Sequence, residues 1–234
     1  MAKRLGAETL VVADDVAGLR RSLAAGEVDA ILVPAGLVGA DVPAAVPKRR
    51  DARDAVIGAK LGTLPAGAKV AVSSALRHAQ LREAWPELVA VTPGDAHDAQ
   101  IVTLAEMDDP STAVELLDLA DWPTAAGQGA LAVVTRAGDE ALAASADHRP
   151  SRLTVLAELA LLERVGSGAG WSLAAHAELA DGLLFLSGRR YNEGGGHATS
   201  SHALYPEDSR DPAGELAERV AAELLAGGED GGSP

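Results

Sequence analysis

The sequence predicts an α/β protein that ends in an α+β region. Apolar runs of strand length alternate with helical patterns through the first two thirds of the 234 residues, which is typical of sheets covered by helices. The last third has a different order of predicted elements, because three β-rich runs follow one long helical pattern. Asp181-Gly182 between the first two of these runs is a strong hairpin signal, so we expect a three-stranded antiparallel sheet there.

The individual elements follow from periodicity and from residues that begin or end helices. The first 46 residues indicate strand, helix and strand, with Asp14 or Asp15 as the helix N-cap. A closing helix has Pro212 at its first position. The remaining expected elements are strands at 55–58, 69–73, 88–92 and within 99–107, and helices at 74–85, 111–120 and 152–165.

Composition excludes several classes of function. The net charge of -14 argues against binding a phosphate backbone, which needs clustered Lys and Arg. Cysteine is absent, which excludes disulfides, thiolate metal sites and any group held through a thioether. The spacing of the six histidines does not predict a metal site. No run of 18 apolar residues and no secretory signal is present, so we expect a cytoplasmic protein with no nucleic-acid or membrane partner.

Two segments could bind a ligand. The glycine-rich elbow "GSGAG" (166–170) resembles a phosphate loop, but a dinucleotide fold needs a strand before it and a helix after it, and here that order is reversed. In "VAVSSALR" a strand ends at Ser73, a helix begins near Ser74, and Arg77 lies one turn further. Hydroxyl groups, free N–H groups and a cation make a carboxylate-binding corner. An N-cap with a surface arginine explains these residues equally well.

Three phrases in order resemble the hydroxymethylbilane synthase (porphobilinogen deaminase) family. They are "RRDARDAVIGAKLGTLPAGAKVAVSSALRHAQLREAWPEL" (49–88), "AAGQGALAVVTR" (125–136) and "LTVLAELALLERVGSGAGWSLAAHAELADGLLFLSG" (153–188). The resemblance implies two periplasmic-binding-protein-like α/β domains, both truncated here, and a C-terminal α+β domain. The expected boundaries are 1–46 with 126–148, 47–125 and 149–226, with a disordered tail at 227–234.

The resemblance also shows which family residues are lost. Family members join porphobilinogen units to a dipyrromethane primer held by a cysteine, and Ala169 stands at that position. Leu37 stands where the family has its catalytic aspartate, and Gly36 where it has a lysine. We therefore expect no catalytic residue, no dipyrromethane cofactor and no metal. Ser73, Ser74 and Arg77 remain as candidate ligand-binding residues.

Three hypotheses about function follow. The first is a degenerate family member of tetrapyrrole biosynthesis, a pseudoenzyme that binds a pyrrole or small carboxylate or regulates another enzyme. The second is an active transferase that deaminates porphobilinogen without a covalent primer. The third is an oligomeric scaffold or interaction protein, because shortened domains would leave apolar faces uncovered.

Overall fold

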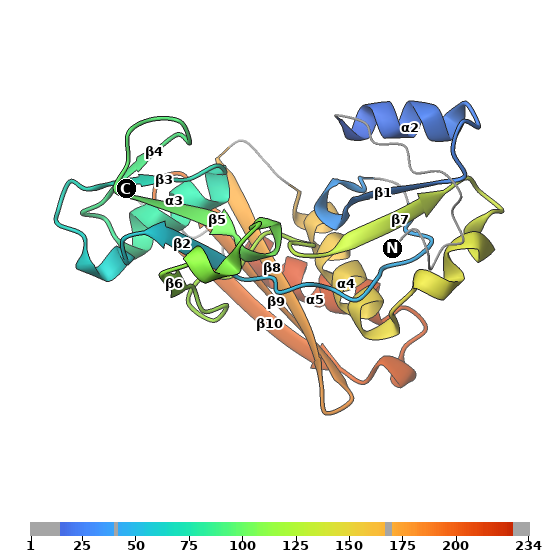
Figure 1. Cartoon of the computed structure of the whole chain (residues 1–234). Coiled ribbons are helices and arrows are strands. Elements are labelled where there is room, and N and C mark those ends of the chain that lie inside the picture. Colours follow the sequence, from blue (N-terminus) through green and yellow to red (C-terminus); the bar gives the residue numbers. More distant parts are fainter. Residues whose placement is uncertain (1–14, 40–41, 167–169, 227–234) are drawn as a thin grey trace.

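The computed structural model describes residues 15–39, 42–166 and 170–226, which form three sheets with helices packed on them (Figure 1). The two-stranded sheet has the order β1-β7, the five-stranded sheet β4-β3-β5-β2-β6, and the three-stranded sheet β10-β9-β8. This arrangement confirms the mixed α/β fold with a three-stranded antiparallel sheet. The domain boundaries stay a prediction.

The two-stranded sheet pairs segments that lie far apart in the sequence. Strand β1 (Ala30–Pro34) runs antiparallel to β7 (Leu131–Thr135). Helix α2 (Val16–Ala24) precedes β1, and the Asp15 side chain caps it by accepting from the Gly18 N–H, as the sequence predicted. The strand expected at 9–13 lies outside the described residues.

The five-stranded sheet is mixed, one of the two arrangements, parallel or mixed, that the alternation of strands and helices allows. Strand β3 runs parallel to β4 and β5, whereas β2 runs antiparallel to β5 and β6. Its elements are β2 (Asp54–Gly58), β3 (Lys69–Ala71), α3 (Ala75–Ala84), β4 (Val89–Val91), β5 (Ala99–Thr103) and β6 (Glu115–Leu116).

The acidic segment 111–120 was wrongly predicted to be a helix. It holds a short 3-10 turn, Pro110–Thr112, and then β6 at the edge of the sheet. The Val114 N–H donates to Val56 O at 2.8 Å, and the Leu117 N–H donates to Asp54 O at 3.0 Å. The open edge of β2 therefore supplies hydrogen-bond partners that outweigh the local helical preference of this segment.

The C-terminal region matches its prediction closely. Strands β8 (Trp171–Ala180), β9 (Leu183–Asn192) and β10 (His197–Leu204) form an antiparallel sheet. Both hairpin residues, Asp181 (φ 51°) and Gly182 (φ 82°), adopt the left-handed conformation that a type I′ turn requires.

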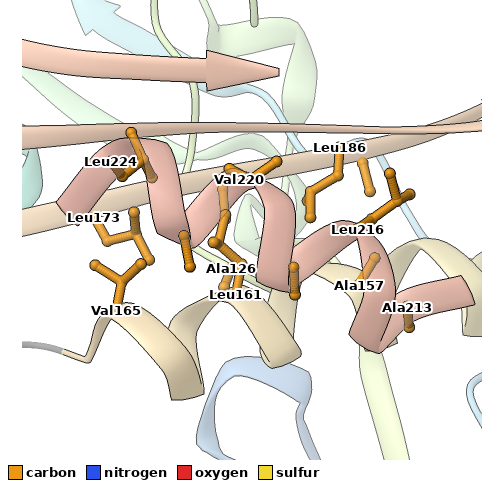
Figure 2. Close-up of a cluster of buried hydrophobic side chains, with 14 of the residues drawn as sticks. Ala126, Ala157, Leu161, Val165, Leu173, Leu186, Ala213, Leu216, Val220 and Leu224 are labelled. Carbon is orange, nitrogen blue, oxygen red and sulfur yellow. The ribbon is translucent and has the colours of Figure 1, made fainter. Parts of the chain in front are cut away.

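Two helices cover one face of this sheet. They are α4 (Arg149–Val165) and α5 (Pro212–Ala226). Figure 2 shows Leu161 of α4, Leu186 of the sheet, and Leu216, Val220 and Leu224 of α5 meeting in one aliphatic core. Short 3-10 turns complete the described chain, at Ala35–Leu37, Leu61–Thr63, Leu104–Glu106, Glu140–Ala146 and Pro206–Asp208.

The connections between the two-stranded and five-stranded sheets run side by side. The Arg50 N–H donates to Gly129 O at 3.0 Å, and Gly129 has a φ of 75°. A Cβ on Gly129 would lie 2.8 Å from Asp51 O. Glycine is therefore required at this crossing both for the backbone conformation and for the close approach.

Candidate functional site

A cavity of about 1020 Å³ lies between α3 and the first residues of β8. Hydroxyl groups, cations and aromatic rings line it together with aliphatic side chains. Two of the six aromatic residues in the chain, Trp171 and Tyr191, contribute to its wall. Polar and apolar residues line the cavity in similar measure, and its volume is large enough for a small molecule.

Ser73 and Ser74 line the cavity at the start of α3. Strand β3 ends at Ala71, and Ser74 is the N-cap, with its hydroxyl accepting from the Arg77 N–H at 3.2 Å. Both serines are exposed to solvent. The structure thus places them at a helix N-terminus beside a cavity, where backbone N–H groups and the helix dipole favour an anion.

Arg77 does not line the cavity with them. Its side chain is buried, and its guanidinium donates to Asp54 through Nε at 2.9 Å and through Nη2 at 2.6 Å. The same group donates to Ser73 Oγ at 2.9 Å and to Thr103 Oγ1 at 2.8 Å. A ligand carboxylate would have to displace one of these partners. Binding by Arg77 therefore stays a prediction that this geometry does not favour.

Asp54 is the centre of this buried network. Besides Arg77, it accepts from Trp122 Nε1 at 2.9 Å and from Gln128 Nε2 at 2.7 Å. Gln128 also donates to Ala52 O at 2.8 Å. The network ties the connecting segments to the five-stranded sheet and leaves its carboxylate without access to a substrate.

Two basic side chains that sequence reasoning missed lie on the cavity wall. His78 and Arg82 follow Ser74 at intervals of four residues, and both are exposed. Residues four apart share one face of a helix, so this spacing was the available signal. Arg82 Nη2 donates to Asn192 O at 3.2 Å. Together with the serines, the His78 ring and the Arg82 guanidinium place hydrogen-bond donors on this side of the cavity.

The position that corresponds to the family's catalytic aspartate has no ionisable side chain. Leu37 belongs to a 3-10 turn, and its side chain is 55% exposed. A Cβ on the preceding Gly36 would lie 2.8 Å from Ala126 O, so the backbone there leaves no room for a longer side chain.

The two ends of the elbow are described, although Ala169 lies outside the described residues. Helix α4 ends at Val165, Gly166 has a φ of 72°, and Gly170 O accepts from the Glu193 N–H at 2.8 Å. Strand β8 then begins at Trp171 on the cavity wall. The elbow therefore ends at the cavity wall.

A buried cation lies close to this elbow. Arg190 on β9 is 7% exposed, and its guanidinium lies 5.6 Å from the centre of the Trp171 ring. Neither Arg190 Nε nor Trp171 Nε1 has a hydrogen-bond partner among the described residues. The sequence offered no signal for this pair, because 19 residues separate Trp171 from Arg190.

The protein has a mixed α/β fold, with a cavity beside the N-terminus of α3. Residues 16–144 match the family model described as "Porphobilinogen deaminase, dipyromethane cofactor binding domain". The chain belongs to the porphobilinogen deaminase family, which acts in tetrapyrrole biosynthesis.

Curated relatives agree with this assignment. Porphobilinogen deaminase of Leifsonia xyli subsp. xyli is 36% identical over 248 residues, covering 90% of this chain and 75% of that protein. The enzyme of Paraburkholderia phymatum is 33% identical, with 90% and 72% covered. That of Acidothermus cellulolyticus is 33% identical, with 92% and 73% covered.

The prediction that the chain takes no cofactor was wrong. The matching family model is that of the dipyrromethane cofactor-binding domain, and it covers more than half of the chain. The prediction rested on the missing cysteine, but attachment and binding are separate properties of a site. The domain that surrounds a cofactor can be present in a chain that has no cysteine.

Other expectations about partners are only partly tested. Within the described residues, no helix has the length and apolar character needed to cross a membrane. The expected oligomer and the cytoplasmic location stay predictions.

Proposed function

We propose that this protein binds porphobilinogen or a related pyrrole carboxylate in the cavity beside α3, without the standard polymerisation on a thioether-held primer. The observation that carries the proposal is the arrangement of Ser73, Ser74, His78 and Arg82 on one wall of the cavity. Hydroxyl groups, a helix N-terminus and cations all favour a carboxylate. The indole of Trp171 and the phenol of Tyr191 offer surfaces for a pyrrole ring.

Each group has a definite part in this proposal. The Ser73 hydroxyl and the free N–H groups at the start of α3 donate to one carboxylate of the ligand. The His78 ring donates to a second carboxylate and Arg82 neutralises it, because each lies one helical turn further along the same face. A bound dipyrromethane supplies the primer to which family members join further pyrroles. Without a cysteine, non-covalent contacts of this kind would have to hold it.

The degenerate character rests on the residues at the family's catalytic positions. Leu37 has no ionisable group that could exchange a proton with a substrate. Arg77 already has a buried partner in Asp54. These two observations support a pseudoenzyme that binds a pathway intermediate.

Titration calorimetry with porphobilinogen on the full chain tests the binding. We expect the His78→Gln/Arg82→Gln variant to bind at least tenfold more weakly than the unchanged protein. Arg219→Gln on α5 is the matched control, because it removes an exposed arginine that does not line the cavity. No heat from the unchanged protein would refute the proposal. Arg77→Ala is unsuitable here, because it leaves Asp54 buried and unpaired.

A second candidate is an active transferase without a covalent primer. The identity of 33 to 36% to curated porphobilinogen deaminases favours it. Incubation with porphobilinogen, followed by absorbance of the oxidised porphyrin product, separates the two candidates. Turnover above the non-enzymatic background would establish the transferase, whereas binding without turnover supports the pseudoenzyme.

A further inference from the structure

One acidic side chain lines the cavity beside α3. Among the described residues that form the cavity wall, Glu193 is the only one with a carboxylate. It follows the last residue of β9 directly and is exposed to solvent. The cavity therefore offers a negatively charged acceptor in addition to the hydrogen-bond donors on α3.

Hydrogen bonds on two sides hold the turn that carries Glu193. The Glu193 N–H donates to Gly170 O at the end of the elbow, at 2.8 Å. Asn192 O accepts from Arg82 Nη2 at 3.2 Å, and the Asn192 N–H donates to Gly196 O at 3.0 Å. The backbone of Glu193 is thus fixed between the elbow and the C-terminal half of α3, next to the cavity.

The Glu193 carboxylate is not used by the fold. Within the part of the chain that the structure describes, it forms no hydrogen bond and no ion pair. Arg82 lies beside the turn, but its guanidinium donates to Asn192 O and not to this carboxylate. The neighbouring acid on α3 differs, because Glu83 is paired with His197. The cavity wall therefore carries a cation and an anion that do not neutralise each other, an arrangement complementary to a ligand with both charges.

Porphobilinogen has this distribution of charge. Besides its two carboxylates it carries an aminomethyl group, which is protonated at neutral pH like the amine of a lysine. An ammonium group has donors only, and a carboxylate is a strong acceptor for them. Joining one pyrrole to another releases the amine as ammonia, so a pyrrole that has already been joined no longer carries this charge.

We propose that Glu193 binds the ammonium group of porphobilinogen and thereby selects the monomer over pyrrole carboxylates that lack the amine. This inference rests on the proposed function. Arg82 and His78 hold a carboxylate of the ligand, and Glu193 holds the opposite charge of the same molecule. Glu193 is thus a specificity-determining residue, contributed by the turn that follows β9.

Titration calorimetry with two pyrroles tests this assignment. The first is porphobilinogen, and the second is opsopyrroledicarboxylic acid, which has the same ring and the same two acid groups but no aminomethyl group. The unchanged protein should bind porphobilinogen about fivefold more tightly than the second pyrrole, as expected for an ion pair at an exposed site. Glu193→Gln should bind porphobilinogen about fivefold more weakly than the unchanged protein does. It should bind opsopyrroledicarboxylic acid equally well or more tightly, because a negative charge near the ligand carboxylates is removed.

Glu163→Gln is the matched control, because Glu163 is an exposed glutamate on α4 that does not line the cavity. It removes the same charge from the protein and should keep the preference for porphobilinogen. Equal affinity of the unchanged protein for the two pyrroles, or a preference that persists in Glu193→Gln, would overturn the inference and leave the proposed function intact. No heat from either pyrrole with the unchanged protein would refute the proposed function and this inference with it.

Discussion

Replacement of Glu158 by glutamine should destabilise the whole fold. Glu158 is fully buried on α4 and accepts four hydrogen bonds. Two come from Arg49, at 2.6 and 3.1 Å, and the others from the N–H groups of Gly127 at 2.7 Å and Ala177 at 2.8 Å. The carboxylate therefore joins a connecting segment, the glycine turn and β8.

The magnitude follows from the way these donors are shared. Each oxygen of Glu158 accepts from one Arg49 nitrogen and one backbone N–H. An amide has only one acceptor oxygen, so either orientation of the glutamine directs its NH₂ group at two donors. Hydrogen bonds to charged groups contribute about 1.5 to 3 kcal/mol each. Glu158→Gln loses two of these hydrogen bonds and leaves Arg49 without a charged partner. The free energy of unfolding should therefore fall by about 3 to 5 kcal/mol, as for other broken buried ion pairs.

Urea unfolding followed by far-UV circular dichroism measures this loss. Glu163→Gln is the matched control, because Glu163 is an exposed glutamate on the same helix, and its free energy of unfolding should change by less than about 0.5 kcal/mol. The double variant Arg49→Met/Glu158→Gln should lose less than the sum of its single variants. A loss below about 1 kcal/mol for Glu158→Gln would refute the assigned network.

Three further outcomes can be measured in the same way. Gly129→Ala should lose about 2 to 4 kcal/mol in urea unfolding, because it adds a backbone contact to the strain of a positive φ. Asp54→Asn should lose about 3 to 5 kcal/mol, because Arg77 would be left unpaired. It should also change the fluorescence of Trp122, whose indole N–H donates to Asp54. Burial lowers the pKa of His176 below its usual 6.5. The free energy of unfolding should therefore decrease as the pH falls below 6.5, by at most about 1.4 kcal/mol per pH unit. His176→Gln should remove this pH dependence.

Each of these predictions has a control and a contradicting outcome. Gly138→Ala isolates conformational strain, because Gly138 has a φ of 93° with no atom near its Cβ position; equal losses at 129 and 138 would mean that the contact is unimportant. Asp51→Asn removes an exposed ion pair with Arg53 and should cost at most about 1 kcal/mol. A pH profile that is identical with and without His176 would contradict the role given to its burial.

Local patterns were sufficient where backbone chemistry decides the outcome. Asp181-Gly182 fixed a hairpin because both residues tolerate a positive φ, and Ser74 marked a helix start because its hydroxyl replaces a missing acceptor. The segment 111–120 was different. Its helical pattern could not reveal that the edge of β2 would offer hydrogen bonds to Val114 and Leu117.

The candidate site was predictable only in part. Ser73 and Ser74 lie on the cavity wall, and ligand binding by them stays a prediction. His78 and Arg82 could have been found from their spacing along α3. The partners of Arg77 could not, because Asp54 lies 23 residues away on another strand. The partner of Arg53 was also not evident from the sequence, because Arg53 pairs with Asp51 rather than with its neighbour Asp54.

The sequence by itself determined most of the helices and strands, the C-terminal antiparallel sheet, the family and the absence of a cysteine. These properties depend on local backbone preferences and on residue identity, which are present in the chain before it folds. The tertiary structure decided which charges are neutralised. It buries Asp54 against Arg77 and Glu158 against Arg49, and it leaves Arg190 without an anion. Such pairings depend on contacts between distant segments, so only the folded chain distinguishes a structural arginine from one available to a ligand.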